Sequence, residues 1–158
     1  MEDQKLNIVD FYQEFDPNLI NFIKGHLFVE NAMMKILDKI PKEKGTSEKF
    51  SGKVSQMLMY NAIDEGMASL LRKINKIRNN IAHDLFYKLT FDEVFELVKE
   101  SADLGVDYSD DSITDKEFAK ECYGLEGLIA ELFPNLYVDL FAANENLFTQ
   151  EELHIFLG

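Results

Sequence analysis

The helical spacing of its apolar residues is the feature that most restricts the fold of this chain. Apolar side chains recur at intervals of three and four residues through most of the length, as in amphipathic helices, and no stretch alternates as a strand does. Only 3 prolines and 8 glycines interrupt the 158 residues. We therefore expect an all-α, single-domain helical bundle over residues 1–158.

Caps and helix-breaking residues predict where the helices begin and end. Asp16 and Pro17 open a long helix that ends before Pro41. Asp64 caps a later helix that ends at about His83. The capping-box pattern, a threonine followed three residues later by a glutamate, predicts three further helix starts: Thr90, Thr114 and Thr149.

The inward-facing positions of these helices predict the core. The expected core residues lie on apolar stripes at helical spacing: Leu27, Leu58, Leu70, Leu71, Ile74 and Ile77. Farther along, the spacing predicts one helix over about 118–133 and one or two short helices over 136–158. No internal repeat or long linker divides the chain, which is typical of one domain.

Composition excludes several classes of protein. Cys122 is the only cysteine, so no intrachain disulfide can form, and no Cys/His cluster offers a zinc site. The common phosphate-loop, esterase and zinc-protease motifs are absent, so we expect neither a metal nor a cofactor. Residues 1–5 are acidic, unlike a signal peptide, and no apolar run approaches the roughly 20 residues that span a bilayer. We therefore expect a cytoplasmic protein with no membrane partner.

Charge is distributed unevenly along the chain. The net charge of −13 argues against a surface that binds a phosphate backbone everywhere. Residues 24–88, however, hold 12 Lys/Arg against 7 Asp/Glu, whereas residues 89–158 hold 3 against 17. Within the basic part, three residues form a stripe that we expect to contact RNA: Arg72, Lys73 and Lys76. The same stripe also fits an ordinary solvated helix surface, and an acidic C-terminal part lying across it would neutralise it.

The three histidines differ in their surroundings. His26 precedes Glu30 by one helical turn, which is typical of a surface hydrogen bond. His154 lies in the C-terminal segment, where we expect no function. His83 closes the segment Arg78-Asn79-Asn80-Ile81-Ala82-His83, at the end of a helix with a basic outer face. This position makes His83 the candidate catalytic histidine.

Arg78 and His83 together suit the cleavage of RNA. A histidine exchanges protons near neutral pH, so it can take the proton of a ribose 2′-hydroxyl or give one to the leaving oxygen. An arginine stabilises the charge that develops on the phosphate, and neither role needs a metal. Five residues of regular helix turn the two side chains roughly 140° apart. They converge only if the helix ends between them or a second subunit completes the site.

This segment resembles the signature of a known family. Arg78-Asn79-x-x-x-His83, preceded by apolar residues at helical spacing, is similar to the motif of HEPN domains. The form Arg-Asn-x-x-Ala-His resembles the mannitol-operon repressor branch of that superfamily. The resemblance covers a core of about residues 17–102 and leaves about 103–158 as an acidic helical C-terminal extension.

The resemblance implies a small helical bundle that forms a homodimer, in which the arginine and histidine of both subunits meet at the dimer cleft. Many such domains are metal-independent endoribonucleases of toxin–antitoxin or phage-defence systems. The resemblance thus implies an RNA substrate and an antitoxin or regulatory protein partner. Carried over to this chain, Arg78 would bind the scissile phosphate, His83 would act as acid and base, and Asn79 would orient the site.

Two alternatives stay open at this point. The repressor-like branch retains similar residues, so the chain could be a non-catalytic dimeric module that regulates transcription or binds a protein. Arg78, Asn79 and His83 could also serve the fold alone, because basic residues in a last helical turn stabilise the exposed carbonyl groups.

Overall fold

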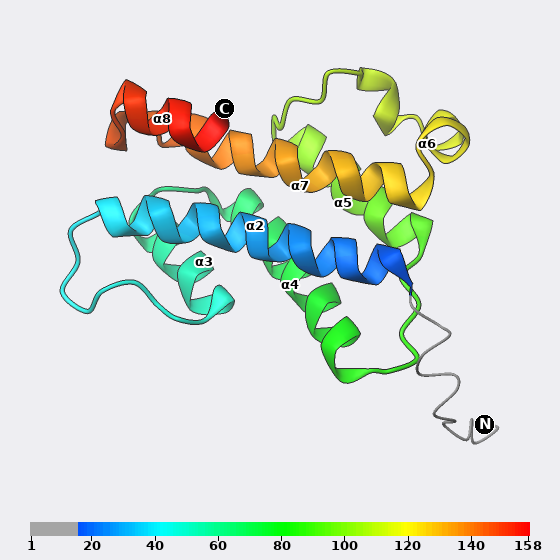
Figure 1. The fold of residues 1–158 in the computed structure, drawn as a ribbon, viewed down its shortest axis with the longest axis horizontal. Coiled ribbons are helices and arrows are strands. Elements are labelled where there is room, and N and C mark those ends of the chain that lie inside the picture. The colour runs from blue at the N-terminus through cyan, green and yellow to red at the C-terminus, as the bar shows by residue number, and fades with distance from the viewer. Residues whose placement is uncertain (1–15) are drawn as a thin grey trace.

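A computed structural model describes residues 16–158, and these residues form seven α-helices and no strand (Figure 1). The predicted all-α fold is confirmed over this part of the chain. The helices are α2 (Pro17–Lys39), α3 (Phe50–Met59), α4 (Glu65–His83), α5 (Phe91–Asp103), α6 (Lys116–Cys122), α7 (Gly124–Ala143) and α8 (Gln150–Leu157). Two short 3-10 helices, η1 (Asp111–Thr114) and η2 (Glu145–Leu147), precede α6 and α8.

Most of the predicted helix starts are confirmed by their hydrogen bonds. The Asp16 carboxylate accepts from the Asn18 amide at 2.9 Å, and the Asp64 carboxylate accepts from the Met67 amide at 2.8 Å. Capping boxes open α5 at Thr90 and α8 at Thr149. Each of these caps satisfies an amide that the first helical turn leaves without a partner.

The predicted start at Thr114 is wrong by one residue. The Asp115 carboxylate caps α6 by accepting from the Phe118 amide at 2.9 Å, whereas the Thr114 hydroxyl donates to the Asp111 carbonyl. The single helix expected over 118–133 is also divided, because Gly124 adopts a φ of +61°, a left-handed conformation that favours glycine. The helix α6 therefore ends at Cys122, before that turn.

The helix α7 continues through Pro134 to Ala143, where shorter helices were expected. Proline lacks the amide that would bond to the Ala130 carbonyl, but Pro134 and Ala130 both lie on the exposed side, where water can bond to that carbonyl. On the other side, Leu132, Phe133 and Leu136 are buried. Burial of these side chains outweighs the loss of one helical hydrogen bond.

The helices α2 and α7 lie side by side and run in the same direction, with α5 also packed against α7 (Figure 1). Gly25 permits the close approach, since a Cβ there would lie 2.0 Å from the Phe133 ring. Phe22 meets Phe133 edge to face at a centroid distance of 5.0 Å. The segment beyond residue 102 therefore supplies α7 to the same core as α2 and α4.

The core of α4 matches the prediction, but that of α2 does not. Leu70, Leu71 and Ile74 are fully buried, and Leu58 and Ile77 pack against the core while partly buried. Leu27 is 53% exposed, so its predicted place in the core is wrong. The buried positions of α2 are Phe22, His26, Val29, Ala32, Met33, Ile36 and Leu37. Treating His26 as polar surface displaces the expected stripe by one residue, or about 100° around the helix.

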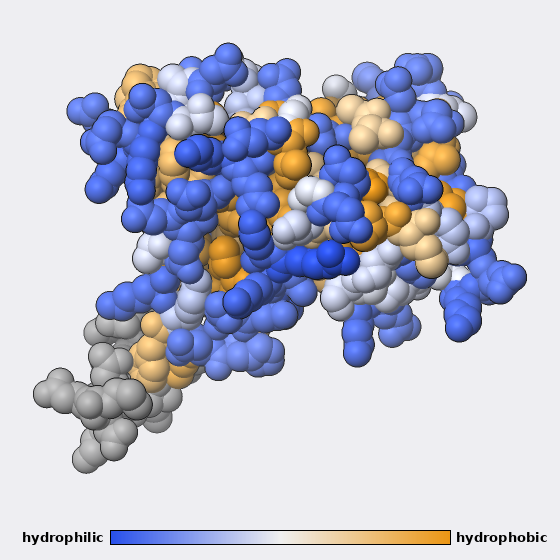
Figure 2. Space-filling view, turned by 180° about the vertical axis from the view of Figure 1, so that it is seen from behind, coloured by the Kyte–Doolittle hydropathy of each residue, from blue (hydrophilic) through white to orange (hydrophobic). Residues whose placement is uncertain are grey.

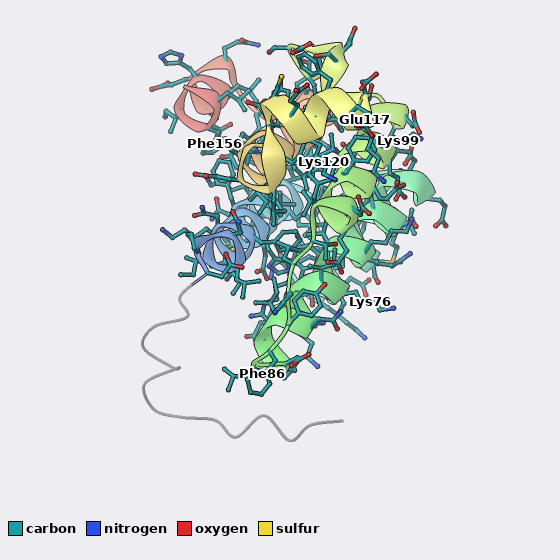
Figure 3. The ribbon with its side chains drawn as sticks, turned by 90° about the vertical axis from the view of Figure 1, so that its right-hand side faces the viewer. Lys76, Phe86, Lys99, Glu117, Lys120 and Phe156 are labelled. Carbon is teal, nitrogen blue, oxygen red and sulfur yellow. The ribbon has the colours of Figure 1, made fainter. Side chains whose placement is uncertain are left out.

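Polar side chains cover most of the surface seen in Figure 2, with hydrophobic side chains showing between them. One exposed apolar patch lies in the connection between α4 and α5, where Leu85 is 61% exposed and Phe86 is 50% exposed. Phe86 lies at the tip of the molecule in Figure 3. Two large apolar side chains thus face solvent directly after the end of α4.

Candidate functional site

The segment from Arg78 to His83 lies within one unbroken helix. The helix α4 ends at His83, and the Asp84 amide still donates to the Asn80 carbonyl at 2.9 Å. The first condition for bringing Arg78 and His83 together, a helix end between them, is therefore not met. Regular helix geometry turns the two side chains roughly 140° apart, so one chain does not bring them to one face.

Arg78 lies at a cleft between three helices. The side chain is partly buried, and its guanidinium is 3.4 Å from the Asn79 side-chain oxygen. The cleft has a volume of about 290 Å³ and is lined by His26, Glu30, Lys49, Phe50, Ser51, Asn75, Arg78 and Asn79. These residues come from α2, from the N-terminal end of α3 and from α4. We call this feature the His26 cleft.

His26 is buried, and the predicted surface hydrogen bond to Glu30 is wrong. The residue is 3% exposed, its Nε2 lies 3.0 Å from the Asn75 side-chain oxygen, and its ring stacks on Phe50 at a centroid distance of 4.1 Å. Its Nδ1 has no hydrogen-bond partner among the described residues. The signal that could have revealed this burial is the helical spacing of His26 with the apolar Phe22 and Val29.

Burial lowers the pKa of His26 from its ordinary value of 6.5, because the imidazolium loses its hydration. The hydrogen bond to Asn75 and the negative charge of Glu30 raise this pKa, and the positive charge of Arg78 lowers it further. Desolvation is the largest of these effects. The imidazole is therefore neutral at pH 7, and the Arg78 charge is close enough to influence it.

A partly buried ion pair sets the charge of the cleft. The buried Lys53 ammonium donates to the Glu30 carboxylate at 3.0 Å and to the Glu48 carbonyl at 2.9 Å. This pairing neutralises Glu30. Arg78 and Lys49 form no ion pair within residues 16–158 and remain as positive charges at the cleft.

His83 lies on the outer side of α4, with the predicted RNA-contacting residues. Arg72, Lys76, Asn79 and His83 are all exposed, and their spacing of four, three and four residues puts them on one face. Figure 3 places Lys76 at the edge of the bundle. The structure thus groups His83 with the basic stripe and groups Arg78 with the His26 cleft.

One residue of the stripe meets an acidic helix. The Lys73 ammonium donates to the Glu100 carboxylate of α5 at 2.7 Å. Arg72 and Lys76 make no ion pair with any described residue. The acidic part of the chain therefore compensates Lys73 and leaves the remaining two charges of the stripe facing solvent.

Residues 16–158 include no helix long and apolar enough to cross a membrane. Over the same range, no three or more His, Cys, Asp and Glu side chains gather as a metal site would require. Comparisons with protein-family models, with curated proteins and with solved structures found no match to this chain.

Proposed function

We propose that this chain is an HEPN-like, metal-independent endoribonuclease that acts as a homodimer. The observation that supports the proposal is the placement of the motif on α4, with Arg78 held at a cleft and His83 exposed at the helix end. In one chain these groups face different ways, so a working site needs Arg78 from one subunit and His83 from the other. A two-fold axis near the C-terminal end of α4 would form two such sites.

The exposed connection after α4 supports this mode of association. Leu85 and Phe86 are large apolar residues that face solvent within three residues of His83. Burying them against the same patch of a second copy removes apolar surface from water and brings the two His83 side chains toward the axis. The interface would then be built at the site of the chemistry, and light scattering should report a dimer. A monomer at micromolar concentration would contradict this mechanism.

The proposed chemistry is attack by a ribose 2′-hydroxyl on the adjacent phosphorus. The bond from phosphorus to the 2′-oxygen forms as the bond to the 5′-oxygen breaks, which leaves a 2′,3′-cyclic phosphate. His83 of one subunit either takes the proton of the 2′-hydroxyl or gives a proton to the departing 5′-oxygen, and water carries out the other proton transfer. Arg78 of the other subunit stabilises the negative charge on the phosphate oxygens as the bond forms. Asn79, on the same face of α4 as His83, orients the substrate. Arg72 and Lys76 draw the RNA to this face.

The test is incubation of the protein with mixed RNAs in the presence of a chelator. Cleavage should continue without a divalent metal and should leave cyclic phosphate ends. His83→Ala and Arg78→Ala should each lower the cleavage rate by at least about 10²-fold, the effect of losing a general acid or base or a charge-stabilising group. His154→Ala is the matched control, because His154 is exposed on α8, and it should cleave at the normal rate.

If the RNA stays intact while the protein is folded, the proposal that this chain is a nuclease is overturned. The hypothesis to test would then be a non-catalytic dimeric module that regulates transcription or binds a protein.

In the toxin–antitoxin form of the proposal, a partner protein acts as an antitoxin that covers the exposed face of α4. The chain would then copurify with that protein, and RNA cleavage would fall when both are present.

A further inference from the structure

The His26 cleft holds features that the proposed nuclease does not use. Of the residues that line the cleft, the proposed RNA cleavage uses Arg78 and Asn79. His26, Lys49 and Ser51 also line the cleft, and none of them belongs to the motif or to the basic stripe. Together these groups determine which ligand fits the cleft.

Hydrogen-bond donors and positive charge dominate the open part of the cleft. Arg78 offers a guanidinium, Lys49 an ammonium and Ser51 a hydroxyl group. The one carboxylate in the lining, Glu30, is paired with Lys53 at 3.0 Å. A ligand with several acceptor oxygens and a negative charge would satisfy these donors together.

The N-terminal end of α3 adds to this preference. Lys49 occupies the N-cap position and provides no side-chain oxygen to the first amides, and the first turn of α3 contains no acidic residue. Phe50 and Ser51 of this turn line the cleft. The positive end of the α3 dipole is thus left without a capping acceptor beside Arg78, and an anion bound there would provide one.

His26 supplies an independent sign of a missing ligand. The residue is 3% exposed and lines the cleft, yet its Nδ1 has no hydrogen-bond partner among the described residues. Its Nε2 faces the Asn75 side-chain oxygen at 3.0 Å, so the proton of the neutral ring lies on Nε2. On this neutral ring Nδ1 is an acceptor, and a buried acceptor without a donor is unfavourable. A ligand that shares a proton with Nδ1, as the P–OH group of a phosphate monoanion does, would remove that penalty.

We propose that the His26 cleft binds the phosphate group of a small phosphate monoester. Arg78 and Lys49 balance its charge, Ser51 and the first amides of α3 donate to its oxygens, and one proton is shared between a phosphate oxygen and Nδ1 of His26. The cleft volume of about 290 Å³ suits a ligand the size of a sugar phosphate or a mononucleotide. Arg78 is shared with the proposed nuclease, but binding in this cleft requires neither RNA cleavage nor a dimer.

Binding should be coupled to the protonation of His26. Two charged groups act on the imidazole, Glu30 of α2 and Arg78 of α4. At α3, Lys49 also lines the cleft and Lys53 is paired with Glu30. A phosphate dianion in the cleft offsets the positive charge of Arg78 and accepts a hydrogen bond from a protonated Nδ1. Both effects favour the imidazolium, so the bound ligand raises the pKa of His26 and binding strengthens as the pH falls toward 6.

The experiment uses the full chain and calorimetric titration with inorganic phosphate, ribose 5-phosphate and ribose at constant ionic strength. Phosphate and ribose 5-phosphate should bind saturably at one site per chain, and ribose should not bind. Lys49→Gln should weaken binding of ribose 5-phosphate at least about tenfold, the loss of one charge-assisted hydrogen bond. Lys44→Gln removes the same charge from the exposed loop before α3 and should bind normally.

The imidazole signals of His26 in an NMR pH titration provide the second readout. Their midpoint should move to higher pH when ribose 5-phosphate is present, whereas the signals of exposed His154 should not move. Absence of saturable binding, or equal weakening by Lys49→Gln and Lys44→Gln, would overturn the proposal. These outcomes are separate from the nuclease test, because phosphate can bind to a chain that leaves RNA intact, and RNA can be cleaved by a chain whose cleft stays empty.

Discussion

The two sides of α4 present the same kinds of polar side chain in very different surroundings. On the inner side, Arg78 shares a cleft with the buried His26 and with Asn75. On the outer side, Arg72 and His83 face solvent and have no ion pair with any described residue. One side of the helix is therefore fixed by packing against α2 and α3, and the other faces solvent in the part of the chain that the structure describes.

This difference between the two sides of α4 means that Arg78 and His83 are positioned in different ways. Packing positions Arg78 before any substrate arrives, which lowers the entropy lost when a phosphate binds. His83 lies exposed in the last turn of α4, so packing among residues 16–158 restrains it less than Arg78. A second copy that covers the exposed Leu85 and Phe86 would order this end of the helix and place His83 against the Arg78 of its partner.

The largest predicted contrast between the two sides is in stability. Ile74→Ala should lower the free energy of unfolding by about 2–5 kcal/mol, because the side chain is fully buried and its removal leaves a cavity. Arg72→Ala, two residues earlier on the exposed side, should change it by less than about 0.5 kcal/mol. Urea unfolding followed by circular dichroism measures both values. Similar losses in the two variants would show that α4 is not packed as described.

The second contrast concerns pH. The pKa of His26 is lower in the folded chain than its ordinary value of 6.5, so the unfolded chain binds the extra proton more readily. The free energy of unfolding should therefore be highest above about pH 6.5 and should fall as the pH drops below that value, by at most about 1.4 kcal/mol per pH unit for one proton.

The measurement is the free energy of unfolding between pH 5 and 8 in the wild type and two variants. His26→Gln should remove the part of the slope that belongs to the buried imidazole. His154→Gln removes an exposed imidazole and should leave the slope as in the wild type. A His26→Gln variant with the full wild-type slope would mean that the buried ring is not the source of the pH dependence.

The smallest predicted effects are those of the basic stripe on RNA binding. Arg72→Gln and Lys76→Gln should each reduce the slope of log K against log salt by about one, the loss of one phosphate contact. Lys73→Gln should reduce it less, because Lys73 is already paired with Glu100 at 2.7 Å. Filter binding at several salt concentrations gives these slopes. Three unchanged slopes would identify the stripe as ordinary solvated surface.

Local signals in the sequence predicted much of the fold. The caps at Asp16, Asp64, Thr90 and Thr149 need only residues within one helical turn, so the sequence is enough to find them. The regular apolar spacing of α4 likewise predicted the burial of its core positions. Features that depend on distant partners were missed. Leu27 satisfies an apolar pattern, yet the face of α2 that is buried depends on contacts such as that of Phe22 with Phe133.

The sequence likewise predicted the local features of the candidate site and missed those that depend on distant residues. Arg78, Asn79 and His83 are visible as a motif, and their spacing already predicted that two of them diverge. The His26 cleft was not predicted, because it joins residues of α2, α3 and α4 that lie far apart in the sequence. The continuation of α7 through Pro134 was missed for a related reason, since burial of the neighbouring residues outweighs the local preference of proline to interrupt a helix.

In the proposed mechanism, Arg78 of one subunit and His83 of the other form one site. The direct test is a heterodimer of an Arg78→Ala chain and a His83→Ala chain, carrying different tags and purified through both. A shared site leaves one of the two sites complete, so the heterodimer should cleave RNA at about half the wild-type rate, although each variant alone is at least about 10²-fold slower. A heterodimer no faster than the two variants alone would contradict the shared site.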